Sequence, residues 1–568
     1  MFEPVGPGLE IFQKRYSLTP EETWGKACKR VARQVSLAES PELAEKWKNR
    51  FLSMLIENKF MPAGRIWYGA GRPKAALFNC FVIPTEDSRE GWGKTVSDMI
   101  VISGMGGGVG INFSAVRPRG TPIKGTGGSS TGSVSLMSIV NAAGEVIKAG
   151  GGRRVALMFD LNLDHPDIEE FLDKKLDLKE LNNANVSVMI PHGKQDEFID
   201  AVRNNKKWDL VWQGKVVKSI PAKRLWDRLV SNMLDSAEPG ILNSHYANEM
   251  NNVWYCRDLV SVNPCGELWL SANEACDLGS IVLPRFIDEK GNLDKESLTE
   301  TITYAVRFLD NVLDITTYPN IEIKQNCQQL RRIGLGIMGL HDMLLKMGLE
   351  YGSKEGVEAV EKVMKFIRNR AYEASSYLAV EKGVFPLFDE EQFMQGGFIK
   401  TLSPGLQHKI KEYGIRNCAL LSIAPTGTIS IVAGVSSSIE PIFAMAYKRR
   451  FMDGEKVKEG IWTHPLYEEY TKKGKTTEHF QSAHDLSVEE HLNMQIACQK
   501  YVDNAVSKTI NVHKKHSRKE INQLILDNLE KIKGVTIYVD GTRGESPLEP
   551  ISEEEVLKNI CPKGVCEI

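Results

Sequence analysis

The chain has 568 residues, 42% of them hydrophobic and 25% charged, which is enough to bury a large core. Its 71 basic and 73 acidic side chains give a formal net charge of -2, which argues against a nucleic-acid-binding or membrane-surface protein. The sequence shows neither an apolar run long enough to span a bilayer nor a signal-peptide pattern, so we expect a cytoplasmic protein.

The predicted elements change character along the chain. Residues 1–100 are mainly helical in pattern, and residues 101–545 alternate short apolar runs with amphipathic segments. The runs GVGINF, ALMFDLN, SVMIP, ALLSIAP and GVTIYV predict strands, and helical spacing of apolar residues predicts helices over 302–313 and 357–367. This alternation predicts an α/β domain with largely parallel strands, open or closed into a barrel. The polar segment 546–568 predicts a mobile tail.

Two glycine clusters invite a functional interpretation. GLGIMG has Gly334, Gly336 and Gly339 at the spacing of a dinucleotide-binding turn, but the preceding NCQQLRRI looks helical where that motif needs a strand. We therefore do not expect nicotinamide binding. GMGGGVG, residues 104–110, runs into a predicted strand, where glycines allow another backbone or a ligand to approach closely.

The ten cysteines are expected to be reduced, because no secretion signal is present. Cys28, Cys327 and Cys498 lie in helix-like segments and are expected in the core, and Cys256 and Cys418 are also taken as structural. Five others lie beside glycine, proline or charged residues in loop-like segments and are candidates for chemistry. They are Cys80, Cys265, Cys276, Cys561 and Cys566.

The most informative segment is NPCGE, residues 263–267. Asn263, Cys265 and Glu267 stand at alternate positions, so an extended loop would point them the same way. A thiol between an amide and a carboxylate can remove a hydrogen atom from a sugar and help a neighbouring hydroxyl leave as water. The same spacing could serve a cysteine nucleophile, but none of the 11 histidines stands in a recognisable cysteine-partner motif.

NPCGE, followed by ACDLGSI and preceded by FNC, resembles the catalytic subunit of ribonucleotide reductase. RPRGTPIKGTGGSSTGSVS, RRIGLGIMGL, APTGTISIVAGVSSSIEP and QKYVDNAVSKTIN extend the similarity over roughly residues 10 to 545. The resemblance implies a ten-stranded α/β barrel with a central finger loop, preceded by a helical N-terminal region. It also implies radical-based reduction of ribonucleotides to 2′-deoxyribonucleotides for DNA synthesis, with diphosphates favoured over triphosphates as the substrate.

The resemblance also assigns roles to the cysteines. Cys265 would carry a thiyl radical that takes the 3′ hydrogen, and Asn263 and Glu267 would handle protons and hydroxyls of the ribose. Cys80 and Cys276 would be the reducing pair, which only the fold can bring within disulfide distance. Cys561 and Cys566 on the tail would reduce that disulfide by thiol exchange, using a thioredoxin-like or dithiol reductant. The alternative interpretation is that Cys561 and Cys566 bind a metal ion.

Nucleotide contacts follow from the same resemblance. PTGTIS follows a predicted strand and suits a phosphate. The substrate would contact Asn79, Gly108, Pro425, Thr426, Gly427, Thr428 and Ile429. A deoxynucleoside triphosphate effector would bind Asp87, Ser88, Arg117, Arg119 and Lys124, in a homodimer whose interface holds the effector. Apart from the family resemblance, the charged side chains of these residues are equally consistent with a solvated loop.

The radical source distinguishes members of this family. No RVxGY-like glycyl segment is present near the C-terminus, and TIYVDGTR places Val539 beside Tyr538 where partner-dependent enzymes have a second tyrosine. Valine cannot relay an electron, so we favour adenosylcobalamin as the cofactor and expect no metal site in the chain. The alternatives are a reductase large subunit that depends on a partner subunit and, from another class, a non-catalytic nucleotide-binding barrel.

Three departures from the family pattern matter. The tail CPKGVCEI has the cysteine spacing of partner-dependent enzymes, and Val155 stands where relatives often have glycine in the loop that links effector to substrate. The resemblance begins near residue 10 and leaves no room for an N-terminal ATP-binding cone, so we expect no overall inhibition by dATP.

Overall fold

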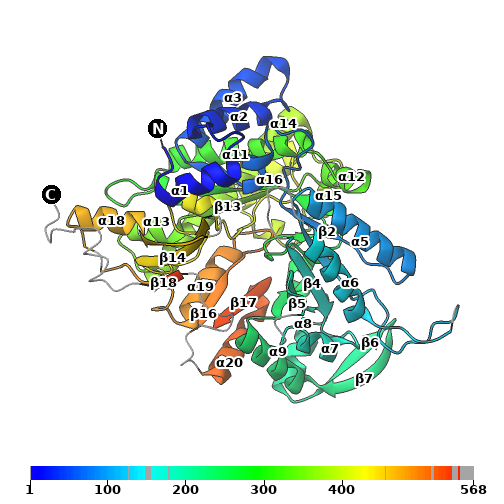
Figure 1. Cartoon of the computed structure of the whole chain (residues 1–568). Coiled ribbons are helices and arrows are strands. Elements are labelled where there is room, and N and C mark those ends of the chain that lie inside the picture. Colours follow the sequence, from blue (N-terminus) through cyan, green and yellow to red (C-terminus); the bar gives the residue numbers. More distant parts are fainter. Residues whose placement is uncertain are drawn as a thin grey trace.

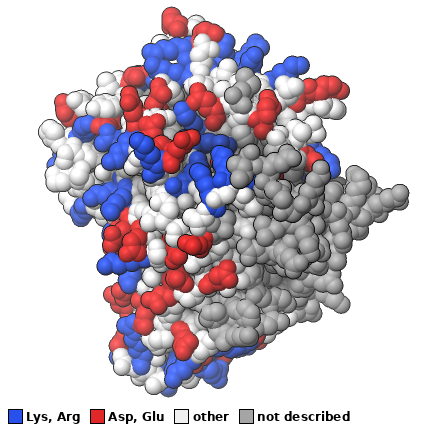
Figure 2. Space-filling model, turned by 90° about the vertical axis from the view of Figure 1, so that its left-hand side faces the viewer, with Lys and Arg blue, Asp and Glu red and all other residues white. Residues whose placement is uncertain are grey.

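The structure is a computed structural model that describes residues 2–125, 127–147, 155–176, 180–453, 456–476, 478–512, 517–539 and 548–550. The predicted tail, with Cys561 and Cys566, lies outside these residues except for 548–550. Helices surround a central group of strands (Figure 1). Acidic and basic side chains are interspersed over the coloured part of the face drawn in Figure 2. None of the helices in the described ranges has the length and apolar character to cross a membrane.

The N-terminal region is mainly helical, as predicted. It contains α1 (Gly6–Ile11), the π-helix η1 (Phe12–Tyr16), α2 (Trp24–Ser36), α3 (Pro41–Ile56) and α4 (Gly64–Gly69). α2 begins where the Thr23 side chain accepts a hydrogen bond from the Lys26 N–H, and it buries Trp24 against Trp67. α2 and α3 pack together and against the long helix α11 (Lys295–Ile315), which joins this layer to the strands.

Eight strands form one sheet in the order β11-β2-β3-β4-β5-β8-β17-β16. They are β2 (Cys80–Ile83), β3 (Gly108–Asn112), β4 (Leu157–Asn162), β5 (Ala184–Ile190), β8 (Gly240–Asn243), β11 (Glu274–Cys276), β16 (Thr509–Val512) and β17 (Gly534–Val539). β2 to β8 run parallel, and β17 is antiparallel to β8. The strands from β2 to β8 are almost continuously buried, as expected for a parallel sheet covered on both faces. Four of the five predicted strands are confirmed here, as β3, β4, β5 and β17.

A second sheet holds β1 (Phe60–Pro62), β12 (Leu278–Val282) and β13 (Gly334–Met338). The fifth predicted strand, ALLSIAP, is only partly formed, with single parallel bridges from Leu421 and Ile423. The N–H groups of Leu420 and Leu421 are held by the Asp503 carboxylate, both at 2.8 Å, so they are not available for a regular ladder. In the described residues the pairings give open sheets and do not close into one ten-stranded sheet.

The glycines of GLGIMG serve strand packing. The helix α12 (Ile321–Leu330) precedes them, as expected, and Gly334 and Gly336 lie in the buried strand β13. A Cβ on Gly336 would lie 2.4 Å from the Ser422 carbonyl oxygen. These glycines therefore allow β13 to approach the neighbouring chain, which is a use of glycine that needs no cofactor.

Residues 260–270 form a hairpin, which we call the finger, from β9 (Ser261–Val262) and β10 (Trp269–Leu270). Three strands hold it through side chains. Asn112 on β3 donates to the Val260 carbonyl at 3.0 Å, Asp160 on β4 accepts from the Ser261 hydroxyl at 2.8 Å, and Asn185 on β5 donates to the Pro264 carbonyl at 2.9 Å. On the other side, Asn504 accepts the Trp269 N–H at 2.6 Å. The finger is thus held by β3, β4 and β5 on one side and by the segment between α19 and β16 on the other.

Glycines on β3 make room for the finger, as the GMGGGVG pattern predicts. A Cβ on Gly108 would lie 2.9 Å from Pro264, and a Cβ on Gly110 would lie 1.7 Å from the Val262 carbonyl oxygen. The first contact is with a side-chain ring, but the second is with backbone, so a larger residue at Gly110 must displace the finger itself.

Replacing Gly110 with Ala is therefore expected to lower the free energy of unfolding by about 1–3 kcal/mol or more, because the added methyl group overpacks the finger. Denaturant unfolding would measure the change. Gly405→Ala is the control, since nothing lies within 4 Å of its Cβ position in helix α16 (Pro404–Tyr413). Equal stability of the Gly110→Ala variant and the parent protein would contradict this close packing.

The remaining elements surround the sheets. The helices are α5 (Arg89–Gly104), α6 (Ser133–Val146), α7 (Ile168–Asp173), α8 (Gln195–Arg203), α9 (Ala222–Ser236), α10 (Ser244–Glu249), α13 (Leu340–Lys346), α14 (Lys354–Lys382), α15 (Glu390–Phe393), α17 (Ile429–Ala433), α18 (Pro465–Lys472), α19 (Val488–Gln499) and α20 (Arg518–Asn528). The outlying strands are β6 (Lys207–Trp212), β7 (Lys215–Pro221), β14 (Ala446–Asp453), β15 (Lys456–Thr463) and β18 (Leu548–Pro550). α11 and α14 confirm the two helices predicted over 302–313 and 357–367.

Candidate active site

Cys265 lies at the tip of the finger. The turn is closed by Asn263, whose carbonyl accepts the Gly266 N–H at 2.9 Å and whose side-chain oxygen accepts the Leu268 N–H at 3.0 Å. Gly266 has a φ of 76°, which glycine adopts without strain. The Cys265 side chain is exposed, but the surface it exposes lines two adjoining cavities within the protein.

The first cavity has a volume of about 290 Å³ and brings together the residues predicted for substrate binding and four of the five predicted catalytic residues, all except Cys276. Its lining includes Asn79, Cys80, Gly108, Asn263, Cys265, Glu267, Pro425, Thr426, Gly427, Thr428 and Ile429. These residues come from the neighbouring strands β2 and β3 and from two segments far away in the chain, the finger and the segment that leads into α17.

Glu267 is buried against this cavity. Burial raises the pKa of its carboxyl to about 7, while hydrogen bonds with Asn263 and with Cys80 partly oppose the shift. The Cys80 thiol lies 3.9 Å from its Oε1, and Oε2 has no partner among the described protein groups. A carboxyl group with a pKa near neutrality can both accept and donate a proton, which is the role predicted for it.

Cys80 and Cys276 face each other across two antiparallel strands. They are 196 positions apart, yet Cys276 on β11 is the register partner of Cys80 on β2. Directly opposed residues in such a pair have Cα atoms roughly 4.5–5.5 Å apart, within the range of a disulfide. The Asn263 amide also donates to the Cys80 sulfur at 3.0 Å, which links the pair to the finger.

All three thiols are held in their protonated form. Burial raises the pKa of Cys80, Cys265 and Cys276 above the ordinary value, and the neighbouring Glu267 adds to the shift for the first two. A conventional cysteine nucleophile needs the opposite shift and a base. No histidine lines either cavity in the part of the chain that is described. The site therefore favours hydrogen-atom and proton transfer over nucleophilic attack.

The segment before α17 is the predicted phosphate loop. Thr426 adopts a φ of 53°, and its hydroxyl accepts the Ser438 N–H at 2.7 Å, which fixes the turn. The Thr428 hydroxyl forms a hydrogen bond with the buried Tyr16 hydroxyl of η1. The N-terminal helical region therefore supports this loop directly.

Neither Tyr16 nor Arg65 stands in a motif that marks it as functional. Arg65, on α4, is buried, lines the first cavity and donates to the Met105 carbonyl. It lies in the segment FMPAGRIWYGAGRP, which from sequence indicates only a break between elements. No local pattern could have found either residue, because Tyr16 reaches the phosphate loop and Arg65 reaches the first cavity only through tertiary packing.

The second cavity, of about 260 Å³, also contains Cys265. Its lining is polar as well as apolar, with Asn185, Glu238, Glu440 and Lys508 among its residues. Lys508 and Glu440 form an ion pair at 2.5 Å. Cys265 thus lines both of the adjoining cavities.

Of the predicted effector residues, the structure brings three together. The Asp87 carboxylate accepts from the Arg117 guanidinium at 2.9 Å, and the adjacent Ser88 hydroxyl caps α5 by accepting the Gly91 N–H at 2.9 Å. Arg117 and Asp87 are both partly exposed, so a ligand at the start of α5 could reach them.

The other two lie further along the same loop. Arg119 is paired with Glu170 at 2.7 Å, and Lys124 is exposed. Neither joins the Asp87–Arg117 pair by a hydrogen bond or ion pair in the described residues.

The other cysteines are structural where they are described. Cys28, Cys327 and Cys498 are buried in α2, α12 and α19, as predicted, and Cys418 is buried while Cys256 is half-buried.

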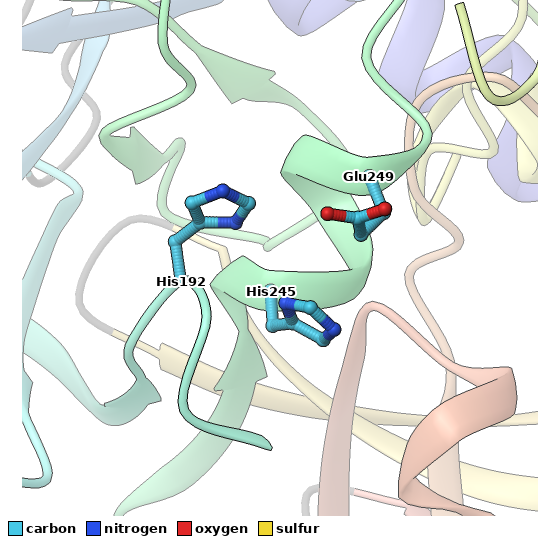
Figure 3. A group of neighbouring side chains, drawn as sticks. All are labelled: His192, His245 and Glu249. Atoms are coloured by element: carbon cyan, nitrogen blue, oxygen red, sulfur yellow. The ribbon is translucent and has the colours of Figure 1, made fainter. Parts of the chain in front are cut away.

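One group of possible metal ligands occurs among the described residues, and it lies outside both cavities. His192, His245 and Glu249 have ligand atoms within 4.8 Å of one another (Figure 3). The Nδ1 atom of His245 accepts the Gly193 N–H at 3.2 Å, and His192 and Glu249 are exposed. We assign no metal to this solvated cluster.

Comparison with known proteins gives consistent matches. Residues 78–538 match the family model described as the ribonucleotide reductase barrel domain, and residues 6–75 match the ribonucleotide reductase all-alpha domain. The chain is 36% identical to the vitamin B12-dependent ribonucleoside-diphosphate reductase of Thermoplasma acidophilum, over 91% of this chain and 72% of that protein. It is 33% identical to the protein of that name from Mycobacterium tuberculosis, over 98% of this chain and 81% of the relative. It is 29% identical to the ribonucleoside-diphosphate reductase subunit alpha of Chlamydia muridarum, over 77% of this chain and 46% of that protein.

Proposed function

The chain belongs to the ribonucleotide reductase family, and from that premise we propose that it reduces ribonucleoside diphosphates to 2′-deoxyribonucleotides by radical chemistry at Cys265. The observation that supports this most is the position of Cys265 at the finger tip, in one cavity with Asn263, Glu267 and Cys80.

The residues divide the reaction between them. Cys265, as a thiyl radical, takes the 3′ hydrogen atom, and the Glu267 carboxylate accepts the proton of the 3′ hydroxyl. The 2′ hydroxyl leaves with a proton as water. Cys80 and Cys276 together supply two electrons and two protons and form a disulfide, and Cys265 returns the hydrogen atom to C3′. The products are one deoxyribonucleotide, one water and one disulfide, so atoms and electrons balance.

This role for Glu267 predicts a pH dependence. Its pKa of about 7 lies above the ordinary value, so the carboxyl group is protonated below neutrality and ionised above it. If the carboxylate accepts the substrate proton, kcat/KM should rise as the pH increases through about 7. Glu267→Gln should lose this rise together with most of the activity. A pH profile of unchanged shape in the Gln variant would contradict the assignment.

For the radical source we propose adenosylcobalamin, which supplies a carbon-centred radical when bound. The relatives named as vitamin B12-dependent support this, as does Val539, which cannot replace a relay tyrosine beside Tyr538. The second cavity is the proposed place for the adenosyl group, because its lining combines polar residues such as Asn185 and Ser187 with Cys265. Cys265 could then receive the radical from one cavity and use it in the other.

The nucleotide sites are proposed as the sequence suggests. Thr426 to Ile429 would bind the substrate phosphates. Asp87, Ser88 and Arg117, with Arg119 and Lys124 on the same loop, would bind a deoxynucleoside triphosphate that selects the substrate. The Asp87–Arg117 pair and the Ser88 cap place three of these groups at the start of α5.

A homodimer would place the effector at the subunit interface. α5 and α6 pack side by side (Figure 1). The apolar side chains of Ile100, Val101, Ile139 and Val146 on these helices are exposed. An apolar surface formed by two adjacent helices suits a second copy of the chain.

We also propose that ten strands form a closed barrel around the finger. Asp277 alone separates β11, which pairs with β2, from β12, which pairs with β13. The bridges at Leu421 and Ile423 connect β13 toward Val506 and β16. The domains would be 1–100, 101–545 and the tail 546–568, although β2 already belongs to the eight-stranded sheet. Cys561 and Cys566 on the tail would reduce the Cys80–Cys276 disulfide.

An assay of the pure chain tests the proposal. Adenosylcobalamin, a dithiol, a ribonucleoside diphosphate and a deoxynucleoside triphosphate should together yield deoxynucleotide. No product under these conditions, but product on adding a metal-loaded second subunit, would favour the partner-dependent alternative. Nucleotide binding without product in either case would favour a non-catalytic barrel.

A further inference from the structure

A third cavity, which no finger residue lines, lies between α10, α14, α19 and residues 530–533. We call it the basic cavity. It has a volume of about 640 Å³, which is within the range of small-molecule sites. Its lining shares no residue with the two cavities at Cys265. The proposed function uses none of its residues.

Cations dominate its lining. Lys365, Arg368, Lys500, Lys531 and Lys533 line the cavity, against one carboxylate, Glu530. Lys365, Lys500 and Lys531 are exposed at the rim, whereas Arg368 and Lys533 are only 3% and 1% exposed. The basic cavity therefore has positive charge both at its mouth and in its interior.

The two buried cations lack a carboxylate partner. Arg368 donates to the Thr401 hydroxyl at 3.3 Å and lies 5.2 Å from the ring centre of Tyr501. Lys533 donates to the Asp503 backbone carbonyl at 2.5 Å. Neither forms an ion pair within the described ranges. Burial lowers the pKa of both groups, that of Lys533 to about 7, although Asp503 partly opposes the shift for Lys533.

The nearby acids are already engaged. The Asp503 carboxylate accepts the N–H groups of Leu420 and Leu421 and the Tyr372 hydroxyl, and burial raises its pKa. Glu361 pairs with Lys500 at 3.0 Å. A buried cation is costly unless an anion accompanies it, so the interior of the basic cavity is suited to an anion from outside the chain.

The lining also suits a planar ring. Tyr246, Phe398 and Tyr501 present aromatic surface in the same cavity. Cations beside aromatic rings are the combination that binds phosphate groups and stacks a nucleobase. We propose that the basic cavity binds a nucleoside polyphosphate, at a site separate from the proposed substrate and effector sites.

Binding of tripolyphosphate to the full chain would test the phosphate contacts. Equilibrium dialysis would compare the parent protein with a Lys365→Gln/Lys531→Gln double variant. Both lysines are exposed at the rim, and neither forms an ion pair among the described residues. Losing two charged contacts should weaken binding at least about tenfold. The control is Lys290→Gln/Lys295→Gln, which removes two exposed lysines outside the cavity and should bind as the parent does.

A photoreactive azido-ATP would test the location. The proposal expects crosslinks on peptides that contain Tyr246 or Tyr501, reduced in the Lys365→Gln/Lys531→Gln variant. Equal tripolyphosphate binding by the two double variants would overturn it. So would crosslinks confined to the phosphate loop and α5, because the nucleotide would then occupy only the sites already proposed.

Discussion

Replacing Cys265 with Ser is expected to abolish deoxynucleotide formation, with a loss of at least about 10³-fold in kcat, because a hydroxyl group cannot take over a thiyl radical. Release of tritium from 3′-labelled substrate, which reaches water by exchange while the Cys265 thiol holds it, should disappear as well, since no group remains to take the 3′ hydrogen atom. Substrate binding should persist, because the phosphate loop is unchanged. Product formation and tritium release can be measured in the same reaction.

Cys256→Ser is the matched control for this variant. Cys256 is a half-buried free thiol that lines neither cavity at Cys265. The Cys256→Ser variant should retain both deoxynucleotide formation and tritium release. Deoxynucleotide formation by the Cys265→Ser protein at the parent rate would refute the radical assignment.

Replacing Cys276 with Ser is expected to affect deoxynucleotide formation but not tritium release from C3′. Deoxynucleotide formation should fall by at least about 10³-fold, because Cys80 then has no partner with which to form a disulfide and the two electrons are not supplied. Tritium release from C3′ should continue, since Cys265, Asn263 and Glu267 remain in place. This difference from Cys265→Ser distinguishes the reducing thiols from the radical carrier.

Cys327→Ser tests whether the effect is one of packing. Cys327 is buried next to the same strand and donates to the Ala275 carbonyl at 3.3 Å, but it is not paired with Cys80. The Cys327→Ser variant should form deoxynucleotide at most of the parent rate. Loss of tritium release and of product alike in Cys276→Ser would show that Cys276 supports the site by structure and would contradict its role as a reductant.

The sequence predicted the elements that depend on local pattern. Strands such as β3 and β5 and helices such as α11 follow from continuous apolar runs and from helical spacing, which are properties of neighbouring residues. Exceptions arise where a distant group intervenes. ALLSIAP has the composition of a strand, but Asp503 binds two of its N–H groups and leaves only isolated bridges.

The sequence by itself determined which residues could carry the chemistry, because Asn263, Cys265 and Glu267 are close in the chain and their spacing and resemblance are visible there. Only the tertiary structure decided what surrounds them. Register pairing places Cys80 opposite Cys276, and packing brings Tyr16 to the phosphate loop and Arg65 to the first cavity. Contacts across hundreds of residues depend on strand order and side-chain packing, and no local pattern encodes these. The basic cavity also depends on tertiary structure, since its cations come from separate elements. Only the folded chain shows that its two buried cations have no carboxylate partner among the described residues.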